Sequence, residues 1–170
     1  MRVLETERLN LRWLNQGDVE FILDLLNQPS WLEFIGDRGV HNLNDACGYI
    51  KNGPLAMIKQ HGFGLYLTEL KSSQEAIGLC GLIKRETLDD VDIGFAFHPG
   101  YWGKGYAREA AKACLDYASE QLKLSRLVAI TLPENQASIA LLKAIGMQYE
   151  KEINLGDSDE ILQLFSKELA

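Results

Sequence analysis

The chain has 170 residues, of which 46% are hydrophobic and 24% charged, and we expect one globular domain spanning residues 1–170. Its formal net charge of −7 argues against nucleic acid as a partner, because phosphate binding needs a basic face. The charged N-terminus has no apolar run and no segment has the apolar length of a membrane span, so we expect a cytoplasmic protein with no membrane partner.

Three cysteines, Cys47, Cys80 and Cys114, are widely spaced and form no C-x-x-C pair. That spacing does not suit a zinc site, and an odd number without an export signal does not favour disulfides. We therefore expect reduced cysteines in the core and no metal.

The first part of the chain changes from strand to helix periodicity. Residues 8–14 alternate apolar and polar side chains, which predicts a half-buried strand. Apolar residues then recur at helical spacing over residues 15–28, and Pro29 closes that helix. Residues 30–40 are predicted to be irregular.

A second helix is predicted to begin at a cap formed by Asn44 or Asp45 and to run through residue 50. Asn-Gly-Pro at residues 52–54 is expected to break it, with a further turn to residue 60.

Three short apolar segments separated by polar turns follow, which is typical of an antiparallel meander. The expected strands are residues 64–70, 76–84 and 91–97.

A long helix is predicted over residues 105–122, with a stripe of small side chains that lets its axis approach a sheet closely. The stripe consists of Ala107, Ala111, Cys114 and Ala118.

The last part of the chain contains a β-branched strand at residues 126–132, followed by a helix at residues 136–145. Asn135 is a suitable N-cap for that helix, and Gly146 a suitable left-handed residue after it. A closing pair of strands is expected, at residues 147–154 and 160–169, across a turn at residues 156–158.

The expected order of elements is β-α-α-β-β-β-α-β-α-β-β. This order predicts a mixed α/β fold, with a largely antiparallel sheet of about seven strands flanked by about four helices.

The stretch HPGYWGKGYAREA, residues 98–110, joins the meander to the long helix. A P-loop needs G-x-x-x-x-G-K-[ST], but His98 stands five residues before Gly103, and Gly105 follows the lysine. The dinucleotide fingerprint needs a small final residue where Arg108 stands, and a βαβ repeat instead of a meander. The stretch therefore fits neither nucleotide site.

What remains is a turn whose backbone amides point at an anion at a helix N-terminus. Unpaired N–H groups and the helix dipole favour phosphate there, and Gly103 and Gly105 permit unusual backbone angles. A plain strand–helix turn, with glycines that serve geometry alone, is the competing interpretation.

Three motifs, in order along nearly the whole chain, carry a resemblance. GYWGKGYAREA, preceded by DIGFAFHP, resembles the pyrophosphate-binding signature of the GNAT superfamily of acyl-CoA-dependent N-acyltransferases. ITLPENQASIALLKAIGMQYE, residues 130–150, is similar to the family's segment of strand, Asn-x-x-Ser, helix and Gly-Phe. TERLNLR, residues 6–12, resembles the start of the ribosomal-protein N-terminal acetyltransferase branch, which is RimJ/RimL-like.

The resemblance implies a GNAT-like fold and acetyl-CoA as cofactor, with coenzyme A as product. The strand through Phe97 and His98 would lie beside the pantetheine arm, and the turn amides would hold the pyrophosphate. The implied cofactor-binding residues are Phe97, His98, Trp102, Gly103, Lys104, Gly105, Tyr106, Ala107, Asn135 and Ser138. Trp102 and Met147 depart from the superfamily's usual Gln or Arg and Phe, but neither departure touches the backbone amides.

Acetyl transfer needs a neutral amine, a stabilised oxyanion and a leaving thiolate. A backbone N–H of the Ala96–Phe97 region is the candidate oxyanion donor. Asp92 is the candidate catalytic base, against the alternative of a solvated residue in an acidic turn. Ser138 is the candidate acid for the thiolate, against the alternative of a helix-start hydroxyl bonded to nearby backbone.

Residues 31–38 fall where this family usually forms its acceptor site. The carboxylates of Glu33 and Asp37 would attract an amine there, although a charged surface loop is the simpler interpretation. Cys80 and Cys114 lie on expected core faces, which favours direct transfer without a covalent enzyme intermediate.

Resemblance to the branch implies a protein N-terminal α-amine as the acceptor. A small-molecule amine (a polyamine, amino acid or antibiotic) and a non-catalytic acyl-CoA sensor are the alternatives. Because family members often dimerise, we expect a monomer or a homodimer.

Overall fold

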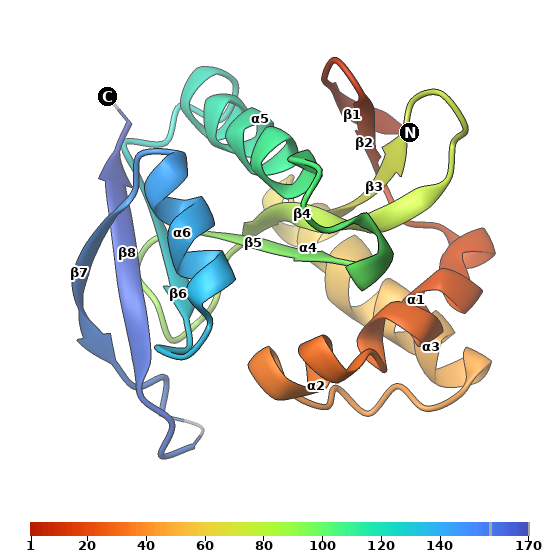
Figure 1. Ribbon diagram of the computed structural model, residues 1–170, viewed down its shortest axis with the longest axis horizontal. Coiled ribbons are helices and arrows are strands. Elements are labelled where there is room, and N and C mark those ends of the chain that lie inside the picture. The colour runs from red at the N-terminus through yellow and green to blue at the C-terminus, as the bar shows by residue number, and fades with distance from the viewer. Residues whose placement is uncertain (157, 170) are drawn as a thin grey trace.

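A mixed sheet with helices on both faces organises the chain (Figure 1). The computed structural model describes residues 1–156 and 158–169. Its strands are β1 (Arg2–Glu5), β2 (Leu9–Arg12), β3 (Leu65–Leu70), β4 (Ala76–Ile83), β5 (Asp92–Phe97), β6 (Arg126–Thr131), β7 (Gln148–Ile153) and β8 (Leu162–Glu168).

Its α-helices are α1 (Val19–Leu26), α2 (Pro29–Phe34), α3 (Leu43–Ile50), α4 (Ala56–His61), α5 (Tyr106–Glu120) and α6 (Gln136–Ala144). Three short turns of other helix types are η1 (Gln16–Asp18), η2 (Lys51–Leu55) and η3 (Pro99–Tyr101). None of these helices is long and apolar enough to span a bilayer.

The strand order is β1-β2-β3-β4-β5-β6-β8-β7, and only the β5–β6 pair is parallel. This confirms the expected mixed, largely antiparallel α/β fold, including the meander of β3 to β5. Among the described residues the sheet has eight strands. The additional strand, β1, is a four-residue edge strand with no fully buried side chain, and so it has no clear alternation.

The two halves of the sheet separate where β5 meets β6. These strands pair only at Asp92 and Val128, where the Val128 amide donates to the carbonyl of Val91 at 3.0 Å. Beyond that point β5 keeps β4 as a partner on one edge and leaves its other edge open. The parallel pair therefore forms the base of a split in the sheet.

Helix α5 packs on β4 and β5 at one face of the sheet. Ala111, Cys114 and Ala118 are buried there, as the spacing predicted, and their small side chains allow close contact with the strands. Ala107, at the start of the same stripe, is only partly buried and lines a cavity.

Helices α1 and α3 cover the other face. Ile22 and Leu25 of α1 and Ile50 of α3 are buried against Leu67 and Leu79 of the sheet. Figure 1 shows α1 to α3 below β3 to β5, on the side away from α5, and α4 behind these strands.

Three local expectations for this helical layer were wrong. Residues 30–40 were expected to be irregular, but Pro29 is the first residue of α2, because its fixed φ is preorganised for a helix start. Helix α3 is capped by Asn42, whose side chain accepts from the amide of Asp45, and not by Asn44 or Asp45. The expected break at residues 52–54 is a π-helical turn, which accommodates the missing N–H of Pro54.

The C-terminal expectations were confirmed where the structure describes them. Asn135 caps α6, and Gly146 has φ +95° directly after it. Strands β7 and β8 form the closing hairpin, while Asp157 of its expected turn lies outside the described residues.

Candidate active site

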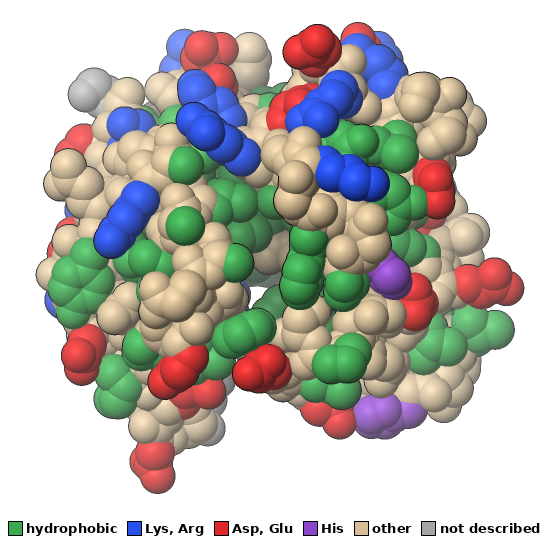
Figure 2. Space-filling model, in the orientation of Figure 1, with side chains coloured by type: hydrophobic (Ala, Val, Ile, Leu, Met, Phe, Trp, Pro, Cys, Tyr) green, Lys and Arg blue, Asp and Glu red, His purple; other side chains and the backbone are tan. Residues whose placement is uncertain are grey.

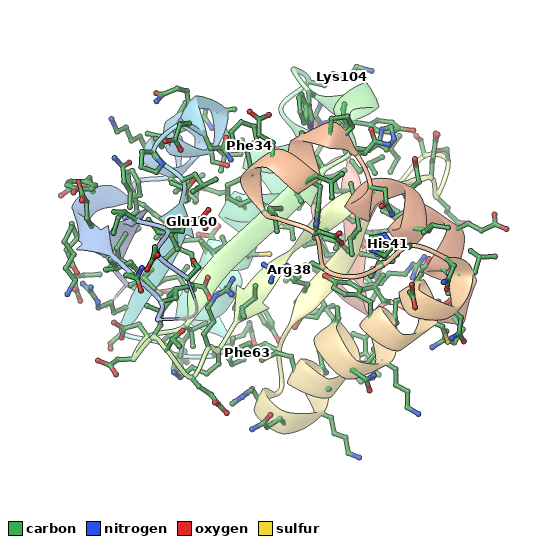
Figure 3. The ribbon with its side chains drawn as sticks, turned by 90° about the horizontal axis from the view of Figure 1, so that it is seen from below. Phe34, Arg38, His41, Phe63, Lys104 and Glu160 are labelled. Carbon is green, nitrogen blue, oxygen red and sulfur yellow. The ribbon has the colours of Figure 1, made fainter. Side chains whose placement is uncertain are left out.

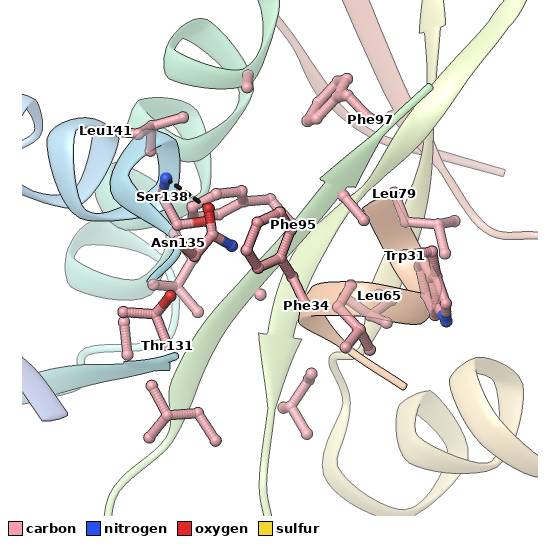
Figure 4. A pocket seen from close by; sticks show the side chains of 18 of the residues that line it. Trp31, Phe34, Leu65, Leu79, Phe95, Phe97, Thr131, Asn135, Ser138 and Leu141 are labelled. Atoms are coloured by element: carbon pink, nitrogen blue, oxygen red, sulfur yellow. Dashed lines mark hydrogen bonds between the residues drawn. The ribbon is translucent and has the colours of Figure 1, made fainter. Parts of the chain in front are cut away.

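A cavity of about 1140 Å³ begins at the N-terminus of α5, passes the split between β5 and β6, and extends to α2 to α4. Figure 2 shows it as a hollow that separates two lobes of the surface. Figure 4 shows two facing walls: Asn135, Ser138 and Leu141 on one side, and Trp31, Leu65 and Leu79 on the other.

Most residues predicted for the site line this one cavity. They are Asp92, Phe97, Trp102, Gly103, Gly105, Tyr106, Ala107, Asn135 and Ser138. His98 and Lys104 are not among the lining residues. The His98 ring lies 3.0 Å from Asp24 and accepts from the amide of Gly100. The Lys104 ammonium lies 5.8 Å from the centre of the Tyr101 ring.

The turn before α5 presents unpaired backbone amides to the cavity. Gly103 and Gly105 have φ values of +78° and +82°, a left-handed conformation that glycine adopts without strain. No side chain in the described part of the chain caps α5, and the first amide bonded at its start is that of Glu109, to the carbonyl of Gly105. Among the described residues, the amides of residues 103–107 have no acceptor, so this turn has the donors of an anion site.

Arg8, from the segment before β2, holds this turn in position. Its Nη1 donates to the carbonyl of Lys104 at 2.9 Å, and its guanidinium lies 4.4 Å from the centre of the Tyr106 ring. Because C=O and N–H of a trans peptide point in opposite directions, this contact turns the amide of Gly105 away from Arg8.

Glu109 of α5 anchors Arg8 in turn. It accepts from the Arg8 backbone amide at 2.9 Å, from Arg8 Nε at 2.7 Å and from the Thr6 hydroxyl at 2.5 Å. Burial opposes ionisation of Glu109, but these hydrogen bonds outweigh it and hold the pKa of its carboxyl below the usual value. The N-terminal hairpin and the turn are therefore fixed to each other by a charged network.

Strand β5 turns backbone donors toward the split. The amide of His98 donates to Ile77 of β4, so the backbone groups of every second residue before it also face β4. The amides of Phe95 and Phe97 therefore face the open edge. This refines the expected Ala96–Phe97 region, because the amide of Ala96 points into the ladder. The carbonyl of Phe97 is occupied by the indole N–H of Trp102 at 2.8 Å.

Asn135 and Ser138 meet at the start of α6. The side-chain oxygen of Asn135 accepts from the Ser138 amide at 3.2 Å, which leaves the Asn135 amide nitrogen directed toward the pocket (Figure 4). The Ser138 hydroxyl makes no hydrogen bond with any described residue. The alternative interpretation, in which this hydroxyl bonds to nearby backbone, therefore does not agree with the structure.

Asp92 lies at the base of the split and is 1% exposed. Its Oδ2 accepts from Arg85 Nε at 3.3 Å, while its Oδ1 has no partner among the described residues. Burial raises the pKa of Asp92 above its ordinary value, and the guanidinium of Arg85 offsets this only in part. Asp92 is thus not the solvated turn residue of the alternative interpretation.

Cys80 and Cys114 lie in the core with their Sγ atoms 3.7 Å apart, as free thiols. The hydrogen bond with Cys114, together with burial, raises the pKa of Cys80, which disfavours a thiolate. Neither residue lines the cavity. This agrees with direct transfer.

Sequence reasoning assigned no site role to Arg8, Arg85 or Tyr49. Arg8 belongs to the TERLNLR motif and lies on the polar face of the expected strand, and this is the pattern that could have identified it. Arg85 and Tyr49 belong to no recognisable sequence motif. Only the fold brings them to the cavity.

The donor set fits a coenzyme A thioester. The turn offers amides for a pyrophosphate, the open edge of β5 offers backbone groups for an amide-containing arm, and the cavity is large enough for an extended ligand. In the part of the chain that the structure describes, no group of three or more potential metal ligands occurs.

Comparison with known proteins agrees with this geometry. The sequence model of the acetyltransferase (GNAT) domain matches residues 8–148. The protein YkkB of Bacillus subtilis (strain 168) is 32% identical over 153 residues, which cover 88% of this chain and 87% of YkkB. The N-acetyltransferase p20 of Bacillus licheniformis is 30% identical over 88% of this chain and 84% of its own.

Solved structures show the same architecture. The acetyltransferase of Agrobacterium tumefaciens str. C58 has a TM-score of 0.82 at 30% identity, covering 96% of this chain and 92% of that one. RimL, a ribosomal L7/L12 alpha-N-protein acetyltransferase solved with coenzyme A, has a TM-score of 0.82 over 99% and 98% of the two chains. Its identity is 17%, which supports the fold alone. From its domain match, its relatives and its fold, this chain belongs to the acetyltransferase (GNAT) family.

Proposed function

We propose that this enzyme transfers the acetyl group of acetyl-CoA directly to a primary amine, and that the amine is a protein N-terminal α-amine. One observation carries the proposal: a single cavity contains both the unpaired amides of the turn before α5 and the buried carboxylate of Asp92. The first suits a pyrophosphate, and the second suits an amine.

The donor would be held by backbone groups. The amides of residues 103–107 would bind the pyrophosphate, reinforced by the dipole of the fifteen-residue helix α5. The amide nitrogen of Asn135 and the open edge of β5 would bind the pantetheine arm of the cofactor. Bound in this way, acetyl-CoA supplies the activated acyl group and a thiolate leaving group.

The open edge of β5 would also stabilise the oxyanion. The amides of Phe95 and Phe97 face the split, and a fixed N–H donor of this type contributes about 3 kcal/mol in comparable sites. Their orientation is set by the β4 ladder, because each of these amides shares a peptide plane with a carbonyl that faces β4.

Asp92 would accept the proton of the amine. Its buried Oδ1 has no partner among the described residues, and a raised pKa makes a carboxylate a stronger base. An α-amine has an ordinary pKa near ~8, so part of it is already neutral at pH 7, whereas a lysine amine with a pKa near ~10.4 needs more help. This difference supports an α-amine as the acceptor.

Ser138 would protonate the departing thiolate. Its hydroxyl lines the cavity and has no competing partner among the described residues. RimL, which has the same fold, is a ribosomal L7/L12 alpha-N-protein acetyltransferase, and this supports a protein N-terminus as the acceptor.

The test is a thiol-release assay with acetyl-CoA against N-terminal peptides, polyamines and aminoglycosides, together with calorimetric titration of coenzyme A. Saturable release with a peptide supports the proposal. Binding of coenzyme A without release from any amine would indicate an acyl-CoA sensor instead.

A further inference from the structure

The acceptor end of the cavity has an unexpected charge. This end is formed by α2 to α4 and by the sheet face that they cover, and its charged lining residues are Arg38, Arg85 and Asp92. Glu33 and Asp37, the carboxylates expected there, are not among the lining residues, and Asp37 lies 3.4 Å from the imidazole of His41 instead. Two guanidinium groups therefore accompany one carboxylate.

The Asp92 side chain belongs to this end because of the alternation of β5. Asp92, Gly94 and Ala96 share one face of the strand. A Cβ placed on Gly94 would meet Ile83 and Leu65, and Ala96 packs with the cluster beneath α1 and α3. Asp92 thus faces the layer of α1 to α4, away from α5.

Arg38 reaches this end from the loop after α2. Figure 3, seen from below, shows Arg38 over the central strands. Burial raises the pKa of Tyr49 to about 12, and the nearby charge of Arg38 works against that rise, so the guanidinium lies close to this lining tyrosine. Arg38 makes no ion pair or hydrogen bond with any described residue, so its charge is available to a ligand.

Arg85 presents a second set of donors. Its Nε is used on Asp92, and its two terminal nitrogens have no acceptor among the described residues. The side chain is 30% exposed. A guanidinium whose Nε is already bonded can still bind a carboxylate through its two terminal nitrogens, because these donors form a planar fork.

Resting on the proposed acetyl transfer to a primary amine, we propose that the acceptor carries a carboxylate close to that amine. Asp92 receives the amine, while Arg85 and Arg38 bind the carboxylate. Polyamines and aminoglycosides are poor acceptors, because their additional positive charges meet two guanidinium groups. The carboxylate is either an acidic side chain near a peptide N-terminus or the α-carboxylate of a free amino acid.

The experiment measures kcat/KM by thiol release for matched acceptors. A peptide with Glu as its second residue is compared with the same peptide carrying Gln or Lys there, and free glutamate is compared with its α-amide. Spermidine is the polycation. In at least one pair we expect the kcat/KM of the acidic acceptor to exceed that of its neutral match roughly tenfold, which is the effect of one charge-assisted hydrogen bond. The pair that shows the difference identifies the source of the carboxylate.

Arg38→Glu tests the assignment directly. It should abolish the preference for the acidic acceptor, whereas Arg38→Lys should keep part of it. Lys59→Glu is the matched control, because Lys59 is exposed, lies outside the cavity lining and changes the charge by the same amount. That variant should keep the preference of the unmodified enzyme.

The outcomes separate the two proposals. Equal turnover of acidic, neutral and basic acceptors, or a preference unchanged by Arg38→Glu, would overturn the carboxylate inference and leave the acetyltransferase proposal standing. The absence of thiol release with every amine would overturn both.

Discussion

The guanidinium of Arg8 donates to the carbonyl oxygen of Lys104 at 2.9 Å, across 96 positions of sequence. This contact connects the segment before β2 to the glycine turn. Since it fixes the peptide plane between Lys104 and Gly105, it decides which way the unpaired amide of Gly105 points.

Arg8→Ala should therefore weaken acetyl-CoA binding more than it changes the chemical step. The KM for acetyl-CoA is expected to rise about fivefold, corresponding to roughly 1 kcal/mol for partly exposed charge-assisted hydrogen bonds, with little change in kcat. Steady-state thiol release measures both constants. Arg2→Ala removes another exposed arginine of the N-terminal hairpin, which pairs with Glu5, and should leave KM unchanged. An equal rise in both variants would count against a positioning role.

Gly103→Ala should disturb the same turn through its backbone. Gly103 has φ +78° with open space around its Cβ position, so the added methyl group costs about 1 kcal/mol in backbone strain and causes no clash. We expect a similar loss of stability for Gly62→Ala, which has φ +85° and equal space, at the end of α4. Urea unfolding should give matching losses for the two variants. Only Gly103→Ala should raise the KM for acetyl-CoA, and a parallel rise in Gly62→Ala would refute the anion site.

Asp92→Asn should reduce kcat/KM by about 10²-fold, the usual contribution of a positioned general base. The acid limb of the pH–rate profile, which reflects ionisation of Asp92 in the free enzyme, should disappear in the variant. Full activity of Asp92→Asn across pH would exclude Asp92 as the base.

The difference in stability between the unmodified protein and Asp92→Asn should depend on pH in a defined direction. Folding raises the pKa of Asp92, so the folded chain holds its proton more readily than the unfolded chain does. That contribution favours folding below the unfolded pKa and is lost as the pH rises through the higher folded value. The free energy of unfolding of the unmodified protein should therefore fall relative to Asp92→Asn as the pH rises from about 4. Urea unfolding at several pH values measures it, and a constant difference would contradict the raised pKa.

Ser138→Ala should lower kcat about tenfold, at the lower end of the effect of a proton-transfer group, without changing stability. Stability is preserved because the cap of α6 is made by the Asn135 side chain to the Ser138 backbone amide, which alanine retains. Asn135→Ala is the matching comparison, since it removes the cap and should cost about 1 kcal/mol. Unchanged turnover in Ser138→Ala would exclude the Ser138 hydroxyl as the acid that protonates the thiolate.

Sequence alone was enough to predict the meander, the long helix with its buried Ala111 and Ala118, the cap at Asn135 and the left-handed Gly146. Each of these follows from local periodicity or from the conformational preference of one residue. Pro29 and the Asn-Gly-Pro segment were misread for the same local reason. A proline that ends one helix also starts the next, and a missing N–H can be accommodated by a π-helical turn.

What the sequence determined by itself is the glycine turn that opens α5, because Gly103 and Gly105 adopt left-handed backbone angles without strain and the motifs of the family run in order along the chain. Tertiary structure alone decided what surrounds Asp92: the resemblance pointed to residues 31–38 and to Asp92, but nothing in the sequence pointed to Arg85 or Tyr49. Arg38, Arg85, Tyr49 and Asp92 come from separate segments without a shared pattern, and they meet only because β5 and β6 separate beside the layer of α1 to α4. Burial then sets the character of Asp92, because a carboxyl that the sequence places beside other acidic residues has a raised pKa only when the sheet closes over it.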